Sequence, residues 1–253
     1  MSKFLECIGV GKIYPAKTEP VEALRGIDFS CGAGDFVCLL GRSGCGKSTL
    51  LQMVAGLERP TAGQIVVADR ELDGPSTATS IVFQDHGLFP WMTVQKNVEF
   101  NMKARGTKVA ERAAIARRFL DMTSLTAFAD RYPHELSGGM RQRVGIARAL
   151  TTDPKALLMD EPFGALDAQT RGKLQDELLQ IWQQQRTTVL FVTHSIDEAL
   201  LLADRILVFT PRPGRIAADI KVDLPRPRAP QSAEFSALAR ELRGLVGADR
   251  EID

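Results

Sequence analysis

Short apolar runs alternate with longer amphipathic stretches along most of this chain of 253 residues. The apolar runs are rich in β-branched residues, as buried strands are, and occupy 35–40, 78–84, 155–160, 187–194 and 205–210. Helical spacing of apolar residues marks 47–57, 168–185 and 195–203. Strands that alternate with helices form βαβ units, so the pattern predicts an α/β fold with a mostly parallel core sheet.

Three segments depart from this alternation. The stretch from about 94 to 150 has helical spacing, at 108–122 and 138–150, and no strand-like run, which predicts a helical subdomain inserted in the core. Segments 22–30 and 63–72 indicate antiparallel strands and hence an antiparallel β subdomain. Residues 218–253 are polar and proline-rich, then helical. We therefore expect a single domain over 1–253 with a short C-terminal tail at 218–253.

The composition narrows the class of protein only a little. Hydrophobic residues make up 44% and charged residues 25%, which are ordinary globular values. The net charge of +1 gives no basic field, so nucleic acid is not an expected partner. No run approaches the roughly 18–20 apolar residues that span a bilayer, and the first residues lack a signal-peptide core, so a soluble cytosolic chain is expected. The four cysteines show no zinc-ligand spacing and are expected to be buried thiols.

The sharpest chemical motif is Gly-Arg-Ser-Gly-Cys-Gly-Lys-Ser-Thr at 41–49, which follows a predicted strand and opens a predicted helix. Its glycines let successive backbone N–H groups face an anion. Lys47 is expected to reach the β- and γ-phosphates of a nucleotide, and the Ser48 hydroxyl to coordinate Mg²⁺. The alternative is a glycine-rich turn that merely starts a helix.

Further polar residues are expected at the same sheet edge. Asp160 ends the run at 155–160 and Glu161 follows it directly. We expect Asp160 in the metal shell and Glu161 to deprotonate an attacking water. His194 ends the next predicted strand and is expected to contact the γ-phosphate and to hold Glu161 in place, unless it is only structural. Gln84 closes the strand at 78–84, from which its amide is expected to reach metal or water.

A second glycine-rich turn, Ser137-Gly138-Gly139, opens the helix at 138–150 without a lysine. The N–H groups of such a turn suit a phosphate, and a plain helix cap would use the same residues. The residues themselves leave both interpretations open.

The loop at 41–49, Gln84, LSGGMRQR, LLMDEP, GALD and His194, in this order, resemble the nucleotide-binding subunit of ATP-binding-cassette (ABC) transporters over roughly residues 1–216. The resemblance implies the fold of a P-loop NTPase cassette that uses ATP and Mg²⁺. In that family two cassettes meet head to tail and sandwich two ATP molecules. The second turn would then bind the γ-phosphate of ATP seated in the partner's loop, which explains why it needs no lysine.

The remaining site residues follow by matching this sequence to the family's motifs. Tyr14 resembles the aromatic residue that stacks on adenine, and Ala165, Leu166 and Asp167 match the loop that crosses the dimer interface. The implied catalytic residues are Lys47, Gln84, Glu161 and His194, and the implied Mg²⁺ ligands are Ser48, Gln84 and Asp160. The implied ATP contacts are Tyr14, Gly41, Arg42, Ser43, Gly44, Cys45, Gly46, Lys47, Ser48, Thr49, Ser137, Gly138, Gly139 and Asp167.

The segment 84–94, QDHGLFPWMTV, resembles the part of the cassette that docks the coupling helix of a membrane subunit. Leu88, Phe89 and Trp91 are expected to form an exposed apolar patch there; the alternative is that they belong to the core of the helical subdomain. The resemblance implies a peripheral protein at the cytoplasmic face of the cell membrane. Its implied partners are a second cassette, most simply a homodimer, transmembrane permease subunits and, indirectly, a solute-binding protein.

Two segments, FGALDAQTR and FTPRPGRI, are similar to those of the nitrate, sulfonate and taurine importer branch, although 73–80 departs from it. Arg212 and Arg215, in the turn of the second segment, are expected to face solvent. A soluble ABC ATPase of DNA repair or translation is the alternative, although such proteins usually carry two cassettes or a long coiled-coil insertion. A small-molecule kinase would share the first loop but would leave LSGGM unexplained.

Overall fold

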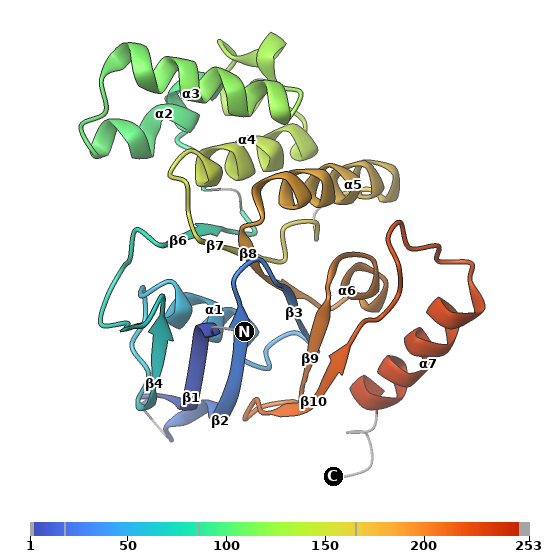
Figure 1. Cartoon of the computed structure of the whole chain (residues 1–253). Helices are drawn as coiled ribbons and strands as arrows, with labels where there is room; N and C mark the ends of the chain where they lie inside the picture. Colours follow the sequence, from blue (N-terminus) through green and yellow to red (C-terminus); the bar gives the residue numbers. More distant parts are fainter. Residues whose placement is uncertain (1–2, 18, 86, 165, 248–253) are drawn as a thin grey trace. The chain divides into compact units, whose positions relative to one another are not determined.

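The computed structural model describes residues 3–17, 19–85, 87–164 and 166–247 and divides into two compact units. One unit combines Met1–Ala78 with Thr188–Asp253, and the other is Thr79–Thr187. Figure 1 shows the helices and strands of both units. No helix in the described ranges combines the length and apolar character that crossing a membrane requires.

The first unit contains an antiparallel sheet in the order β2-β1-β4-β5. Its strands are β1 (Lys3–Tyr14), β2 (Val21–Gly32), β4 (Ala62–Val67) and β5 (Arg70–Glu71). The sequence pattern indicated strands at 22–30 and 63–72 but missed β1. The pairing of β1 shifts register between Cys7 and Val10, around Gly9 (φ +57°), whose N–H donates to Asp28 Oδ1 at 2.7 Å. Such an irregularity breaks the two-residue alternation by which a strand is recognised.

The same unit contains four further strands in the order β10-β9-β3-β8. They are β3 (Phe36–Leu40), β8 (Thr188–Thr193), β9 (Arg205–Phe209) and β10 (Ile216–Lys221). Strand β3 runs parallel to β8 and β9 and is wholly buried, as is β8, whereas β10 is antiparallel to β9. The helices of this unit are α1 (Lys47–Val54), α6 (Ile196–Leu202) and α7 (Ala233–Gly247). From the sequence, most of β10 was interpreted as part of the polar segment 218–253. None of its positions is fully buried, so the strand lacks the apolar run by which the other strands were recognised.

The second unit pairs two parallel strands, β6 (Thr79–Val82) and β7 (Ala156–Asp160), with a group of helices. These are α2 (Val94–Ala104), α3 (Val109–Met122), α4 (Gly138–Leu150) and α5 (Ala168–Gln185), with short 3₁₀ turns at Thr126–Phe128 and Pro133–Glu135. Helices α2, α3 and α4 pack on one another, and α5 contacts α4 (Figure 1). The described residues of 94–150 contain no strand, as the sequence predicted.

All four cysteines are buried free thiols, as expected. Burial raises the pKa of Cys31 to about 12 and that of Cys7 further still, so these thiols stay protonated and unreactive at neutral pH.

Candidate functional site

The glycine-rich loop at 41–46 joins β3 to α1 and curls through two left-handed residues, Gly44 (φ +80°) and Gly46 (φ +99°). At Gly46 a side chain is excluded twice, because a methyl group there would lie 2.6 Å from Leu24 Cδ2 and 2.8 Å from the Ala23 carbonyl oxygen. Residues 42–44 are exposed at the rim of the loop. The loop therefore has the curled shape, with an open rim, that an anion-binding backbone requires.

Lys47 is almost completely buried within this loop, with 3% of its surface exposed. Its ammonium group donates to the carbonyl oxygens of Gly41 at 2.8 Å and Arg42 at 2.9 Å, and it lies 3.6 Å from Cys45 Sγ. The next residue, Ser48, is exposed on the first turn of α1. The loop thus places a cation inside its curl and a hydroxyl beside it.

His194 lies at the same edge of the sheet as this loop. Strands β3 and β8 are parallel, and Leu40 pairs with Thr193. Gly41 directly follows Leu40 and His194 directly follows Thr193, so both residues leave the sheet at the same edge. The His194 side chain is exposed, and Ser195 caps α6 directly after it by accepting the Glu198 N–H at 3.3 Å. The buried Thr193 hydroxyl donates to Glu198 Oε2 at 2.6 Å, which fixes this strand-to-helix junction. His194 therefore follows the strand next to the one that leads into the loop, and its expected contact with the γ-phosphate stays a prediction.

Two further positions named from sequence lie in the first unit. Tyr14 ends β1 and is half-buried, with Lys12 Nζ 4.9 Å from its ring centre. Arg212 is exposed, yet its Nε and Nη2 donate to the Gly44 carbonyl oxygen at 3.3 and 3.1 Å. Arg212 thus lies at the surface, as expected, and the sequence reasoning missed only its contact with Gly44, because the turn that carries it reaches the loop from a distant part of the chain.

In the second unit, Asp160 ends β7 and Glu161 follows it, both half-buried. Glu161 has φ +42°, a left-handed conformation that costs a non-glycine residue of order 1–3 kcal/mol. A methyl group at Gly164 would lie 3.7 Å from Gln84 Nε2 and 3.9 Å from Glu161 Oε2. The exposed Gln84 amide and the Glu161 carboxylate therefore border the same small space, as their expected roles require.

The second glycine-rich turn begins α4. The exposed Ser137 accepts the Met140 N–H at 3.3 Å and so caps the helix. Gly139 packs closely against α5: a methyl group there would lie 2.5 Å from Thr170 Cγ2, so any larger residue would force the Thr170 side chain to move. Gly138 has room for one, since its nearest neighbour would be Leu166 Cδ2 at an ordinary 3.5 Å. Packing within this chain therefore explains the second glycine and leaves the first unexplained.

Asp167 caps α5 beside this turn, where its Oδ1 accepts the Thr170 N–H at 3.0 Å. That backbone hydrogen bond lowers the pKa of the exposed Asp167 carboxyl, which is thus ionised at neutral pH. Ala165, the first residue of the matched segment, lies outside the described residues.

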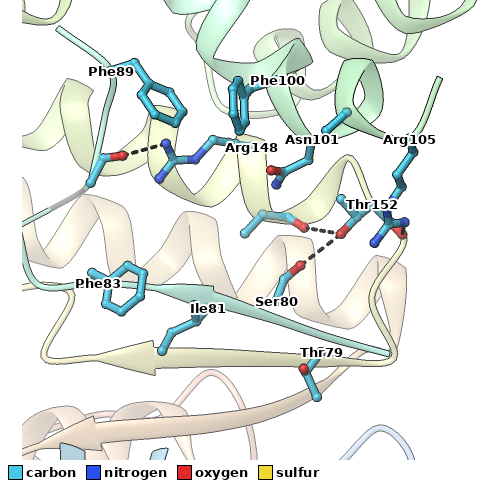
Figure 2. Close-up of a pocket in the computed structure, with 13 residues that line it drawn as sticks. Thr79, Ser80, Ile81, Phe83, Phe89, Phe100, Asn101, Arg105, Arg148 and Thr152 are labelled. Carbon is cyan, nitrogen blue, oxygen red and sulfur yellow. Dashed lines mark hydrogen bonds between the residues drawn. The ribbon is translucent and has the colours of Figure 1, made fainter. Parts of the chain in front are cut away.

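The predicted apolar patch is observed only in part. Trp91 is 70% exposed, but Leu88 and Phe89 are half-buried. The ring centre of Phe89 lies 5.6 Å from that of Trp91 and 4.3 Å from that of Phe100. Figure 2 shows Phe89, Phe100 and Arg148 together at a cavity of about 500 Å³ within the second unit. The Arg148 guanidinium donates to the Gly87 carbonyl at 2.6 Å and lies over the Phe89 ring (Figure 2).

The patch is supported by Asn97, which the sequence reasoning missed. Asn97 is completely buried; its Oδ1 accepts the Phe89 N–H at 2.8 Å, and its Nδ2 donates to the carbonyls of Phe89, Met92 and Thr93 at 3.0–3.1 Å. The available signal was a polar residue at a core position of an amphipathic helix, since Val94, Val98 and Met102 are buried on the same face.

The described residues contain no group of three or more histidine, cysteine, aspartate or glutamate side chains suited to a metal ion. The predicted Mg²⁺ ligands are of a different kind: the Ser48 hydroxyl, the Gln84 amide oxygen and the single carboxylate of Asp160. Oxygen donors of this hard type are those that Mg²⁺ prefers, so the donor set fits that ion.

A curled glycine loop with a buried lysine, between a parallel strand and a helix, defines a nucleotide-binding protein of the P-loop class. The ABC transporter family model matches residues 24–164. The chain therefore belongs to the ABC transporter family, as its motifs indicated, and is one of that family's ATPases.

Curated relatives match most of the chain. A nitrate import ATP-binding protein of Synechocystis sp. is 46% identical over 87% of this chain and 83% of its own length. An aliphatic sulfonates import ATP-binding protein of Bacillus cereus is 44% identical over 92% of both chains. An uncharacterised ABC transporter ATP-binding protein of Methanocaldococcus jannaschii is 48% identical over 93% of this chain and 88% of its own.

The fold also matches solved structures. The ATP-binding cassette MJ0796, in a dimeric post-hydrolysis state bound to ADP and Pi, superposes with a TM-score of 0.78 and 31% identity, over 87% of this chain and 99% of that one. The predicted cassette fold, with a mostly parallel core, an antiparallel sheet and a helical insertion, is confirmed.

Proposed function

We propose that this chain hydrolyses ATP to energise a membrane importer of nitrate, alkanesulfonate or taurine-like solutes. The relatives named for nitrate and sulfonate import support the solute class, since they cover most of the chain at 44–46% identity. The structural observation that carries the proposal is the turn at Ser137 and Gly138. It presents an exposed helix N-terminus with a glycine that packing inside this chain does not require.

The first loop is proposed to hold the phosphates of ATP through the backbone N–H groups of 41–49. Lys47, already inside the curl, would exchange neutral carbonyl acceptors for charged phosphate oxygens, which are stronger acceptors. Tyr14, half-buried at the end of β1, is proposed to stack on the adenine ring.

Glu161 is proposed to be the general base for the attacking water, with His194 orienting it and Gln84 positioning the water. The left-handed backbone of Glu161 supports this role, because strain of that kind concentrates at functional sites. Ser48, Gln84 and Asp160 are proposed to hold Mg²⁺, which would neutralise charge on the transferred phosphoryl group.

Ser137, Gly138 and Gly139 are proposed to bind the γ-phosphate of ATP held by a second copy of the chain. The first N–H groups of a helix have no partner within the helix and carry its positive dipole end, which suits a phosphate. The ionised Asp167 lies beside this turn, where a partner chain would cross. The dimeric state of the cassette MJ0796 supports such an assembly.

The segment Gln84–Val94 is proposed to dock a permease subunit at the cytoplasmic face of the membrane, which would connect the chain indirectly to a solute-binding protein. Trp91 offers an exposed apolar side chain, and Asn97 fixes the backbone that presents it. Nucleic acid is not proposed as a partner, since the net charge is only +1.

The solute class is tested by deleting the gene in its host. The deletion strain should lose growth on nitrate as sole nitrogen source, or on an alkanesulfonate or taurine as sole sulfur source. The wild-type gene should restore growth, and a Lys47→Ala gene should not. Normal growth on all three, with loss of uptake of an unrelated solute, would overturn the solute class and leave the ATPase intact. A DNA-repair or translation defect without any transport defect would favour the alternative class.

A further inference from the structure

The last residue of β9 and the turn between β9 and β10 together touch the phosphate loop at three points. A methyl group at Gly41 would lie 3.0 Å from Phe209 Cβ and 3.1 Å from the Phe209 carbonyl oxygen. Arg212 donates two N–H groups to the Gly44 carbonyl. At Gly214 a methyl group would collide with the Cys45 carbonyl oxygen. These contacts are spread along the loop from Gly41 to Cys45.

The turn itself is firmly anchored. The Gly214 N–H donates to the Ala23 carbonyl, and the Arg25 N–H donates to the Gly214 carbonyl, both at 3.0 Å, which joins the turn to β2. Across the turn, Thr210 and Arg215 exchange two hydrogen bonds: the Thr210 N–H to the Arg215 carbonyl, and the Arg215 N–H to Thr210 Oγ1, both at 3.0 Å. The turn can therefore act as a fixed support.

The planarity of the peptide bond gives this support a directional effect. In a trans peptide, the carbonyl of one residue and the N–H of the next point in opposite directions. The Gly44 carbonyl points at Arg212, so the Cys45 N–H points away from the turn. The Cys45 carbonyl lies against Gly214, so the Gly46 N–H also points away. The two carbonyls that contact the turn thus direct two N–H donors away from it.

We propose that Arg212 is a positioning residue for nucleotide binding: it fixes the Gly44 peptide so that the loop is shaped for phosphate before ATP arrives. This rests on the proposed assignment of 41–49 as the ATP site. Gly44 and Gly46 have positive φ, and ordering such flexible residues costs conformational entropy. If the loop is already ordered before ATP arrives, this entropy is not lost on binding, so the affinity for nucleotide is higher.

Arg215 provides a matched control. It lies in the same turn, carries the same charge and is also exposed, and its guanidinium makes no hydrogen bond or ion pair among the described residues. The pKa of Glu22 is lowered mainly by the hydrogen bond from Arg25, and the charge of Arg215 adds a smaller effect. A difference between Arg212→Ala and Arg215→Ala therefore reports the contact with Gly44 rather than the charge of the turn.

The test measures dissociation constants for ATP and ADP, and KM and kcat for ATP hydrolysis, in the full-length wild type, Arg212→Ala, Arg212→Lys and Arg215→Ala. Loss of one charge-assisted contact should weaken ATP and ADP alike by about 3–10-fold in Arg212→Ala. KM should rise in parallel while kcat stays nearly unchanged. Arg215→Ala should bind as the wild type does, and Arg212→Lys, with a single donor group, should lie between.

The salt dependence of nucleotide affinity distinguishes a positioning role of Arg212 from direct attraction between its charge and the phosphate. Attraction between an exposed arginine and a phosphate is screened above about 0.5 M salt, whereas a preformed loop is not. The affinity ratio between wild type and Arg212→Ala should therefore persist at high salt. Collapse of the ratio, equal losses in both alanine variants, or a fall in kcat with unchanged KM would each overturn the proposal. Lys47→Ala is the reference: normal ATP binding by that variant would refute the ATP-site assignment itself.

Discussion

The ammonium group of Lys47 donates to the carbonyl of Gly41 at 2.8 Å, so the first residue of α1 is bonded to the first residue of the phosphate loop. This bond keeps a buried cation inside the curl, where its cost of burial is offset by neutral acceptors. In the proposed complex, a phosphate in the loop would offer the same ammonium a charged acceptor, so we expect binding to exchange one partner of Lys47 for another.

The first prediction concerns this lysine. Lys47→Ala should weaken ATP binding and reduce turnover by about 10² or more, because a cation is removed from the transferred phosphoryl group. The measurements are nucleotide affinity and steady-state ATP hydrolysis, with the melting temperature followed to confirm folding. Lys155→Ala, at an exposed lysine before β7, is the control and should behave as the wild type. Unchanged turnover in Lys47→Ala would contradict the role of the loop.

Substitution of Glu161 should reduce ATP hydrolysis without reducing ATP binding. Glu161→Gln keeps the shape and hydrogen-bonding capacity of the side chain but removes its basicity, so ATP binding should persist while hydrolysis falls by about 10² or more. The check is ATP affinity beside single-turnover hydrolysis, with Glu71→Gln, at an exposed residue of β5, as the control. Hydrolysis close to that of the wild type would exclude Glu161 as the base.

The sequence predicted those features of the fold that depend on residues close to one another in the chain. The loop at 41–49 and the cap at Ser137 are local backbone features, so their glycines and polar residues predict them directly. Asp160 ends β7, which is parallel to β6 in one unit, and His194 follows β8, which is parallel to β3 in the other, so the sequence placed each residue correctly at the carboxyl end of a parallel strand. The bond from Arg212 to Gly44 could not be predicted in this way, because it joins residues 168 positions apart and no local pattern encodes it.

The second turn should make dimerisation depend on ATP. In Glu161→Gln with Mg-ATP, light scattering should report a dimer, because each nucleotide would bridge two chains. Adding Ser137→Arg should abolish it, since a bulky side chain would fill the exposed start of α4. Ser236→Arg, at an exposed serine of α7, is the matched control and should leave the dimer intact. A double variant with Ser137→Arg that dimerises normally would rule out the head-to-tail sandwich.

Arg228 should be important for stability. It is 9% exposed and donates to the Leu200 and Ala203 carbonyls, both at 2.6 Å, at the C-terminal end of α6. Burial lowers the pKa of Arg228 to about 10, so it remains charged at neutral pH and complements the helix dipole. Arg228→Ala should cost about 2–4 kcal/mol of unfolding free energy and lower the melting temperature by roughly 5–10 °C. Arg243→Ala, at an exposed arginine of α7, should have no comparable effect.

Trp91 should matter for membrane recruitment and not for catalysis. Its side chain is 70% exposed, so Trp91→Ser should leave the fold and the basal ATP hydrolysis unchanged. A large aromatic side chain at an interface is commonly worth 2 kcal/mol or more, so binding to the permease should weaken by about tenfold or more. Val109→Ser, at a residue of α3 that is 66% exposed, removes a comparable exposed apolar side chain away from the patch and serves as the control.

The measurement is co-sedimentation of the purified chain with membrane vesicles from a host strain that lacks its gene. Wild type and Val109→Ser should sediment equally, and Trp91→Ser should remain mostly in the supernatant. Phe89→Ala should also lose binding, because the Phe89 ring supports both Trp91 and the cavity. Equal sedimentation of all four proteins would place the docking surface elsewhere on the cassette. Equal loss in Trp91→Ser and Val109→Ser would indicate non-specific apolar adhesion and would contradict a docking surface centred on Trp91.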